Sequence, residues 1–327
     1  MARVASHEIV EIRCKSLLNR VTSQRMPFRW SINPYRGCLH RCTYCYARRY
    51  HTFLDLNAAS DFESKIFVKV NAPDVLRHEL SKPSWRREKV AIGTAVDPYQ
   101  PVEGKYKLTR KVLEVLLEAW TPCSIVTKNA MIRRDLDVLA ELAQGPGCTV
   151  YLSLTTLDEA LAKRLEPGTP PPRRRLETVA ELVRCGIDAG VMIAPVLPGL
   201  TDGPGLERMV EEAFAHGARF VDWGVLRLDE GVKEVYLDFV KAEAPRLLPM
   251  YGRMYEGAYA PSEYERRIDA RLSKATESAL ANRAGSRPED AGGRLLPKAR
   301  KDPLRAPQAA QSPVRRPLLP LQLQLDF

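Results

Sequence analysis

The sequence predicts an α/β protein whose parallel sheet is curled into a full or partial barrel, followed by a disordered C-terminal tail. Three observations support this prediction. Short apolar runs alternate with amphipathic segments between residues 28 and 256, which is typical of βαβ units. The alternation gives six such units, and repeated right-handed crossovers curl a sheet. Beyond residue 282 the chain is rich in Pro, Gly, Ala and Arg and poor in aromatic residues, as disordered segments are.

Six apolar runs are the predicted strands of the main sheet. They cover residues 28–35, 90–94, 124–128, 149–155, 187–196 and 220–226. The first run ends in Asn-Pro, a turn signal, and leads directly into a loop with three cysteines. The segment 61–70 (DFESKIFVKV) also alternates as a strand does, and we expect it to pair outside the main sheet.

Helical periodicity separates these strands and defines the domain boundaries. The predicted helices cover residues 46–54, 108–120, 133–143, 158–165, 176–185, 205–216, 232–248 and 262–282. The chain is therefore expected to divide into four parts. These are an irregular lead-in (1–27) with one alternating segment (8–13), a core domain (28–256), a helical extension (257–282) and a disordered basic tail (283–327) that ends in a short apolar motif.

The composition fits a globular protein of a reducing compartment. A chain of 327 residues with 45% hydrophobic content can bury a sizeable core. It has no apolar run long enough to span a bilayer, and its first residues lack the continuous apolar segment of a secretory signal. Seven cysteines, three of them clustered, argue against a disulfide framework. We therefore expect a cytoplasmic protein with no membrane partner.

The basic charge permits a nucleic-acid partner without requiring one. The chain carries 50 basic and 40 acidic residues, a net charge of +10. Residues 283–327 contain nine Lys or Arg and four Asp or Glu, so half of the excess lies in the tail. The part expected to fold is therefore only mildly basic.

Cys38, Cys42 and Cys45 fall within eight residues of the loop that follows the first predicted strand. Thiolates are soft ligands that select zinc, copper(I) or iron–sulfur clusters. A structural zinc site takes four ligands, whereas three thiolates on a four-iron cluster leave one iron open for chemistry. The spacing therefore favours a 4Fe-4S cluster. The alternatives are a zinc site that recruits His40 as fourth ligand and three buried cysteines that bind no metal.

The CxxxCxxC pattern, with an aromatic residue before its last cysteine, resembles the cluster-binding loop of the radical S-adenosylmethionine (SAM) enzymes. Its context, within residues 28–255, is similar to the spore photoproduct lyase-like branch: NPYRGC, CTYCYARRYH, DFESKIFVK, GTAVDPYQPVE and SIVTK. The resemblance implies a partial (β/α)6 barrel of the radical SAM type, with SAM and a 4Fe-4S cluster held by the three cysteines as cofactors. It also implies reductive SAM cleavage by a flavodoxin- or ferredoxin-type reductant, and hydrogen abstraction from an unidentified substrate, with damaged nucleic acid as the leading candidate.

The same resemblance implies that five further residues belong to the site. Tyr44 matches the aromatic residue near the SAM adenine, and Tyr46 matches a tyrosine that lines the site and relays a hydrogen atom, which makes it the catalytic candidate. Asp97 matches the acidic residue that binds the SAM ammonium. Lys128 and Ser153 match positions that contact the SAM carboxylate or ribose. The structural alternatives are tyrosines packed on the barrel rim, a turn-forming aspartate before proline, and a serine bonded to backbone.

The sequence leaves two interpretations open for each of two further motifs. The arginine run at 173–175 either binds phosphates or begins a solvated helix. The last six residues, 322–327 (QLQLDF), are similar to the peptide by which bacterial repair proteins dock on the replication sliding clamp, and the alternative is a tail that folds back on the core.

One departure limits what the resemblance implies. Spore photoproduct lyase has a hydrogen-donating cysteine near the strand that here reads AIGTAVD, whereas this chain has Gly93, Thr94 and Ala95 and no thiol there. Repair of the spore thymine lesion itself is therefore not expected. The leading hypothesis is a radical SAM enzyme with another substrate, and the alternative is a non-catalytic zinc- and nucleic-acid-binding protein.

Overall fold

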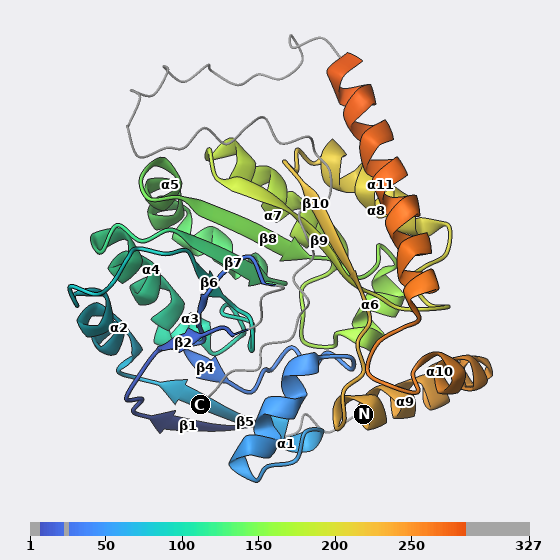
Figure 1. Ribbon diagram of the computed structural model, residues 1–327, viewed down its shortest axis with the longest axis horizontal. Helices are drawn as coiled ribbons and strands as arrows, with labels where there is room; N and C mark the ends of the chain where they lie inside the picture. The colour runs from blue at the N-terminus through green and yellow to red at the C-terminus, as the bar shows by residue number, and fades with distance from the viewer. Residues whose placement is uncertain (1–6, 23–25, 286–327) are drawn as a thin grey trace.

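A computed structural model describes residues 7–22 and 26–285 of the chain (Figure 1). Its main sheet has seven strands in the order β10-β9-β8-β7-β6-β3-β2. Six of them are parallel and follow one another along the chain, while β2 is antiparallel at one edge. Their bounds are β2 Leu18–Arg20, β3 Trp30–Ile32, β6 Val90–Ile92, β7 Cys123–Thr127, β8 Cys148–Ser153, β9 Asp188–Val196 and β10 Val221–Val225.

The main sheet is open, because β10 and β2 are its two edges in the described part of the chain. Each of the six parallel strands falls within or overlaps one of the six predicted apolar runs. The predicted partial α/β barrel of six units is therefore confirmed. The first predicted strand is shorter than expected, because the chain turns at Asn33 and Pro34 and continues as β4 Tyr35–Arg36 in another sheet.

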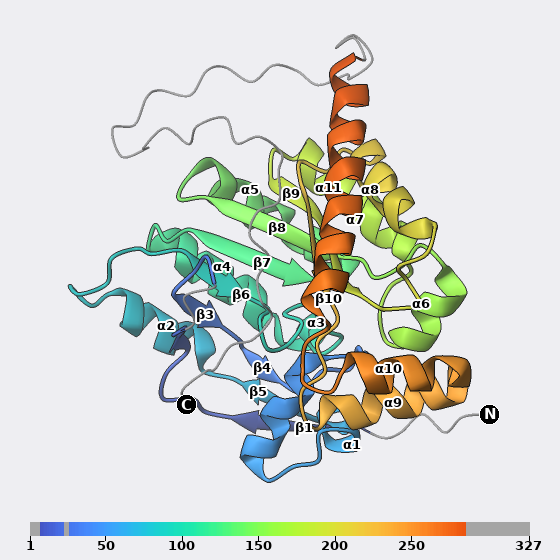
Figure 2. The ribbon, with the colours of Figure 1, turned by 45° about the vertical axis from the view of Figure 1, so that its right-hand side comes forward.

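Helices connect the successive strands and surround the sheet (Figures 1 and 2). They are η1 Tyr46–Leu54, α1 Ser60–Ser64, α2 Ala72–Leu80, α3 Glu103–Tyr106, α4 Leu108–Glu118, η2 Ala130–Asp135, α5 Leu136–Gln144, α6 Glu159–Leu165, α7 Pro172–Arg184, α8 Gly205–Ala215, α9 Val232–Glu243, η3 Pro245–Leu247, α10 Leu248–Met254 and α11 Ser262–Gly285. In these described ranges, no helix combines the length and apolar character needed to cross a membrane.

Prolines explain two differences between the predicted and observed helices. α7 begins at Pro172, four residues before the predicted start, because a proline in the first turn needs no hydrogen-bond acceptor for its nitrogen. The helix predicted at 232–248 is divided at Pro245, where proline cannot donate the next helical hydrogen bond. The sequence analysis did not predict α2 or α3, and α3 spans only four residues.

A second sheet, in the order β1-β5-β4, includes the N-terminal segment. β1 Glu8–Ile12 runs parallel to β5 Lys65–Lys69, and β4 is antiparallel to β5. The prediction that the alternating segment 61–70 pairs outside the main sheet is confirmed for β5. The alternating segment predicted at 8–13 is confirmed as β1, whereas the prediction that the rest of the lead-in is irregular is wrong at β2, which belongs to the main sheet.

α11 packs along β10 and α8, and in Figure 2 it runs vertically beside both elements. It buries Tyr264, Ile268 and Leu272, which are spaced four residues apart on one face. The helix extends three residues past the predicted start of the tail, to Gly285. The rest of that tail, with the apolar motif at 322–327, lies outside the described residues.

We predict that Leu272→Ala lowers the free energy of unfolding by about 2–5 kcal/mol, the usual cost of truncating a buried leucine. Leu272 is 0% exposed in the core that α11 helps to close. The measurement is urea unfolding followed by circular dichroism. Lys274→Ala on the exposed side of the same helix is the control and should change the free energy by less than about 0.5 kcal/mol. Equal stabilities of the two variants would contradict the observed docking of α11.

Candidate functional site

A cavity of about 490 Å³ lies at the carboxyl ends of the parallel strands, where open α/β sheets hold their ligands. The loop with the three cysteines borders one side of it. All eight predicted site residues line this cavity: Cys38, Cys42, Cys45, Tyr44, Tyr46, Asp97, Lys128 and Ser153. The structure therefore brings together side chains from four separate segments, and their chemical roles stay predictions.

The cysteine loop, residues 37–45, connects β4 to η1 and is held in place through its main chain. The amide of Cys38 donates a hydrogen bond to Phe62 O at 2.9 Å. Arg48, which is fully buried, donates from Nε and Nη2 to Cys42 O at 3.0 and 2.9 Å. The protein thus shapes the loop without using the thiols, and all three remain on the cavity wall.

The three thiols fit an iron–sulfur cluster. Burial raises the pKa of Cys42 well above its usual value and raises that of Cys45 to about 11. The free thiols of Cys42 and Cys45 therefore stay protonated, whereas iron would stabilise the thiolates that ligation requires. Within residues 7–22 and 26–285, no three His, Cys, Asp or Glu side chains converge as a single metal ion requires. A cluster does not need that convergence, because each thiolate binds a different iron.

His40 is not placed as the fourth ligand of a zinc ion. Its ring is buried, with Nε2 3.2 Å from Asn129 Nδ2 and Nδ1 3.3 Å from Asp97 Oδ2. Burial acts to lower the pKa of His40. Asp97 and Cys38 favour the charged ring, however, and together they raise this pKa to about 10. Both ring nitrogens face protein partners. The ring therefore serves as a partner of Asp97.

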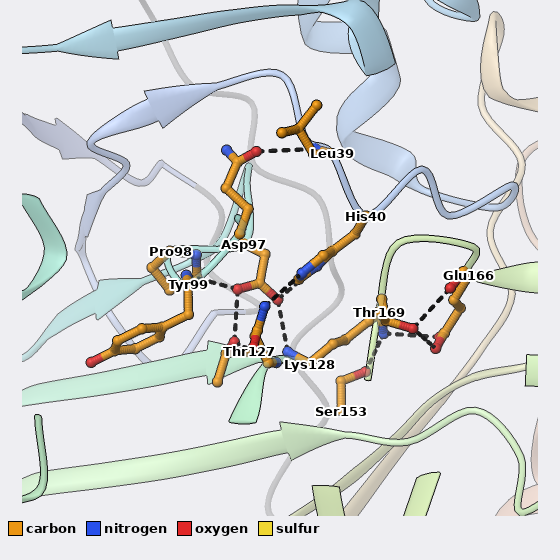
Figure 3. Close-up of polar contacts among 12 residues, drawn as sticks. Leu39, His40, Asp97, Pro98, Tyr99, Thr127, Lys128, Ser153, Glu166 and Thr169 are labelled. Carbon is orange, nitrogen blue, oxygen red and sulfur yellow. Dashed lines mark hydrogen bonds and ion pairs between the residues drawn. The ribbon is translucent and has the colours of Figure 1, made fainter. Parts of the chain in front are cut away.

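Asp97 joins the cysteine loop to the end of β7 (Figure 3). Its Oδ1 accepts hydrogen bonds from Tyr99 N at 2.9 Å and Thr127 Oγ1 at 2.7 Å, and its Oδ2 accepts one from Lys128 N at 2.7 Å. Burial acts to raise the pKa of Asp97, but His40 and these donors have the larger effect and lower the pKa overall. The turn-forming alternative is therefore partly correct. The protein supplies partners for both carboxylate oxygens, which favours a positioning role over direct contact with the SAM ammonium.

Lys128 brings the ends of β7 and β8 into one polar network. Its Nζ lies 2.5 Å from Ser153 Oγ, 3.4 Å from Glu166 Oε1 and 5.6 Å from the centroid of the Tyr44 ring. Ser153 in turn donates to Ala194 O at 3.1 Å, so its predicted alternative as a backbone partner is also present. These contacts fix the Lys128 ammonium on the cavity wall.

Glu166, which the sequence analysis did not identify, is the buried acceptor of this network (Figure 3). It accepts hydrogen bonds from the Tyr44 hydroxyl, from Thr155 Oγ1 at 2.9 Å and from Arg175 Nη2. Burial acts to raise its pKa, but Arg175 and Lys128 hold the pKa of Glu166 well below the usual range. Glu166 is therefore a charged residue whose charge is balanced inside the protein.

The arginine run at 173–175 does not form a phosphate site. Arg175 is buried against Glu166, and this contradicts the phosphate interpretation for that residue. Arg173 and Arg174 are exposed and pair with Glu177 on the first turns of α7. These two match the alternative of a solvated helix start.

The segment 165–169, between α6 and α7, fastens the cysteine loop from the other side. Thr43 N donates to Leu165 O at 2.9 Å, and Gly168 N donates to His40 O at 3.0 Å. A Cβ atom added at Gly168 would lie 2.1 Å from Leu39 O. Only glycine fits this close approach of two backbones.

Both candidate tyrosines present their rings to the cavity while their hydroxyls contact protein. The Tyr46 hydroxyl donates to Thr94 O, and the Tyr44 hydroxyl donates to Glu166. Burial raises the pKa of each well above its usual value, so both stay neutral phenols. The alternative of tyrosines that pack on the barrel rim is therefore correct for the two hydroxyls, although these bond to protein and not to water.

A further part of the cavity wall comes from the end of β10 and from residues 259–269. The sequence analysis placed residues 259–269 outside the core domain. The polar residues of this part of the wall are Arg227, Tyr259, Ser262, Glu265, Arg266 and Asp269. A signal was present in the sequence, because the four residues from α11 are spaced as i, i+3, i+4 and i+7. That spacing marks one face of a helix.

Comparison with known proteins identifies the family. The model of the Radical SAM superfamily matches residues 32–210. An uncharacterized protein of Mycobacterium tuberculosis is 41% identical over 266 residues, which cover 80% of this chain and 78% of that protein. The Radical SAM Nalpha-GlyT isomerase of Pseudomonas phage M6 is 26% identical over 194 residues, 58% of this chain and 37% of that protein.

Solved structures show the same fold. Spore photoproduct lyase complexed with dinucleoside spore photoproduct superposes with a TM-score of 0.61 at 16% identity, covering 83% of this chain and 79% of that one. A mutant of the same enzyme with bound AdoMet and dinucleoside spore photoproduct gives a TM-score of 0.63 at 16% identity, with the same coverage.

We predict that Gly168→Ala displaces the cysteine loop and lowers the iron bound per chain after anaerobic reconstitution at least severalfold, because the added methyl group collides with Leu39 O. Gly203→Ala is the matched control, since nothing lies within 4 Å of a Cβ at that position. Iron is measured colorimetrically, and circular dichroism checks that both variants fold. Iron binding by Gly168→Ala equal to that of Gly203→Ala would show that this contact does not hold the loop.

Proposed function

This chain belongs to the radical SAM superfamily, and from that premise we propose that it abstracts hydrogen from a damaged or modified nucleoside within nucleic acid. Enzymes of this superfamily use a 4Fe-4S cluster and SAM, so the chain is a radical SAM enzyme. Membership also contradicts the alternative of a non-catalytic zinc-binding protein. The observation that carries the proposal is the single cavity that collects the three thiols, the five further predicted residues and a second polar wall.

The support for a nucleoside substrate comes from charge and from kinship. The chain has a net charge of +10, which favours polyanionic partners. A protein of the same fold was solved with a bound dinucleoside spore photoproduct. The fold alone does not choose a substrate, so the proposal is tested on the chemistry of the product.

We propose that Cys38, Cys42 and Cys45 hold the cluster and that SAM occupies the adjoining part of the cavity. When bound, the two cofactors supply the reductive cleavage of SAM that abstracts hydrogen from the substrate. The protein excludes water by burying the cysteine loop and keeps the loop in place through Arg48. A flavodoxin- or ferredoxin-type reductant is proposed as the electron donor.

The remaining site residues are proposed to position SAM. The Tyr44 ring, held by its bond to Glu166, would lie against the adenine. Lys128 and Ser153 offer an ammonium and a hydroxyl for the SAM carboxylate or ribose. Asp97 would act mainly by fixing Lys128, although contact with the SAM ammonium remains part of the proposal.

Tyr46 is the proposed catalytic residue, because no thiol other than the three loop cysteines lines the cavity in the described part of the chain. Gly93 has a φ of +90°, and a Cβ there would lie 2.4 Å from Val126 O. That position therefore cannot hold the hydrogen-donating cysteine expected nearby in spore photoproduct lyase. The Tyr46 side chain borders the cavity and its hydroxyl carries a proton, so we propose that Tyr46 returns a hydrogen atom to the substrate.

We predict that Cys42→Ala abolishes both iron binding and 5′-deoxyadenosine formation, because two thiolates do not replace three on a cluster with one open iron. The fold should persist, since the main chain of the loop is held by Arg48. Cys185→Ala is the control, because that cysteine is exposed and lies away from the cavity. Full SAM cleavage by Cys42→Ala would overturn the ligand assignment.

The proposed function predicts turnover of damaged nucleic acid. The reconstituted enzyme is incubated anaerobically with dithionite, SAM and oligonucleotides that are either ultraviolet-irradiated or intact. Mass spectrometry follows 5′-deoxyadenosine and the modified nucleosides. We expect loss of a modified nucleoside from the irradiated oligonucleotides only. SAM cleavage that leaves every oligonucleotide unchanged would reject nucleic acid as the substrate while keeping the chain a radical SAM enzyme.

A further inference from the structure

We propose that the α11 wall, defined as Arg227 with Ser262, Glu265, Arg266 and Asp269, recognises the hydrogen-bonding edge of the substrate nucleobase. This inference rests on the proposed function, because it assumes a nucleoside substrate. The wall lines the same cavity as the cysteine loop. It is therefore in a position to hold the substrate against the cofactors.

The first step of the argument is the orientation of α11. Its apolar face buries Tyr264, Ile268 and Leu272, so its polar stripe is turned to the cavity. In that stripe Glu265 and Asp269 are half-buried. A cavity wall with two carboxylates fits a polar ligand better than an apolar one.

The second step is that two members of the wall are held in fixed positions. The buried Trp223 donates from Nε1 to Asp269 Oδ1 at 3.0 Å. Arg227 donates from Nε and Nη2 to Asp229 Oδ1 at 3.2 and 2.9 Å, and its Cζ lies 4.4 Å from the centroid of the Tyr259 ring. Side chains that are already fixed lose little conformational entropy when they bind a ligand.

The third step is an incomplete set of partners on Arg227. Its Nη1 is buried and has no hydrogen-bond partner among the described residues, although Nε and Nη2 are both bonded. Arg227 borders the cavity. A rotation of the guanidinium on binding would let a carbonyl oxygen of the substrate supply the acceptor that this nitrogen lacks.

The fourth step is the mixture of charges, which favours a base edge over a phosphate. Glu265 and Asp269 would repel a phosphate group, whereas carboxylates accept hydrogen bonds from the N–H groups of a base. The guanidinium groups of Arg227 and Arg266 donate to its carbonyl oxygens. Tyr259 lies beside them with 47% of its surface exposed, and aromatic rings of this kind stack on bases.

The test uses reconstituted enzyme with SAM and two fluorescent single-stranded 12-mers, one of thymidine and one of N3-methylthymidine. Methylation removes the N–H donor of the base edge and leaves the phosphates unchanged. We expect the wild type to bind the thymidine 12-mer about tenfold more tightly, as the loss of one charged hydrogen bond implies. Asp269→Asn and Glu265→Gln, which remove the charged acceptors of this N–H group, should lose most of this preference, as measured by fluorescence anisotropy.

Arg267→Gln and Glu263→Gln are the matched controls, since both residues are exposed on α11 and neither lines the cavity. They should keep the preference of the wild type. A wild type that prefers thymidine together with wall variants that keep this preference would overturn the role of the α11 wall alone. A wild type that binds both 12-mers equally would also overturn the role of the α11 wall alone. A wild type that binds neither 12-mer would overturn both this role and the nucleic-acid substrate.

Discussion

The buried ion pair between Glu166 and Arg175 is the interaction on which the candidate site depends. A carboxylate and a guanidinium, each 1% exposed in its side chain, pay a large desolvation penalty that only close pairing and further hydrogen bonds offset. Those further bonds come from Tyr44 and Thr155, and Lys128 adds a second cation. Removing one partner of such a pair typically costs about 3–5 kcal/mol, because the other charge is left buried. The same carboxylate therefore joins the cysteine loop, the ends of two strands and the start of α7.

Asp97 likewise joins the cysteine loop to a strand end, because it accepts hydrogen bonds from the end of β7 and contacts His40. Between them, the two carboxylates fix Tyr44, Lys128 and the backbone around the cysteines before any cofactor binds. This arrangement follows a general requirement of radical chemistry, in which the protein supplies position and exclusion of water while the cofactor supplies reactivity. Polar groups that already have protein partners do not need to reorganise when the ligands arrive.

The sequence predicted the repeating units of the fold and the cysteine loop, because both are local signals. Strand runs, helix periods and the spacing of Cys38, Cys42 and Cys45 are each contained within a few residues. All eight candidate residues line the cavity because they lie at or near strand ends, which a parallel sheet collects at one edge. Their proximity was thus predictable from topology, although their roles still need the experiments above.

The rest depended on contacts between distant segments. Glu166 stands in a polar loop, and only the fold shows that Arg175 and Tyr44 reach it. Three adjacent arginines look alike in the sequence, yet one of them is buried and two are exposed. The pairing of β1 with β5 and of β2 with β3 was not predicted, because alternation within a strand does not show which strand it pairs with. The sequence analysis assigned no role to the polar residues at the start of α11, and only the cavity shows what they border.

The two walls of the cavity come from opposite ends of the described chain, one from residues 37–45 and the other largely from residues 259–269. None of the hydrogen bonds described above that hold the backbone of the cysteine loop comes from the second wall. Related chains are therefore free to diverge at α11 while they keep an unchanged reactive centre. A lineage could in this way acquire new substrates by altering a single late helix.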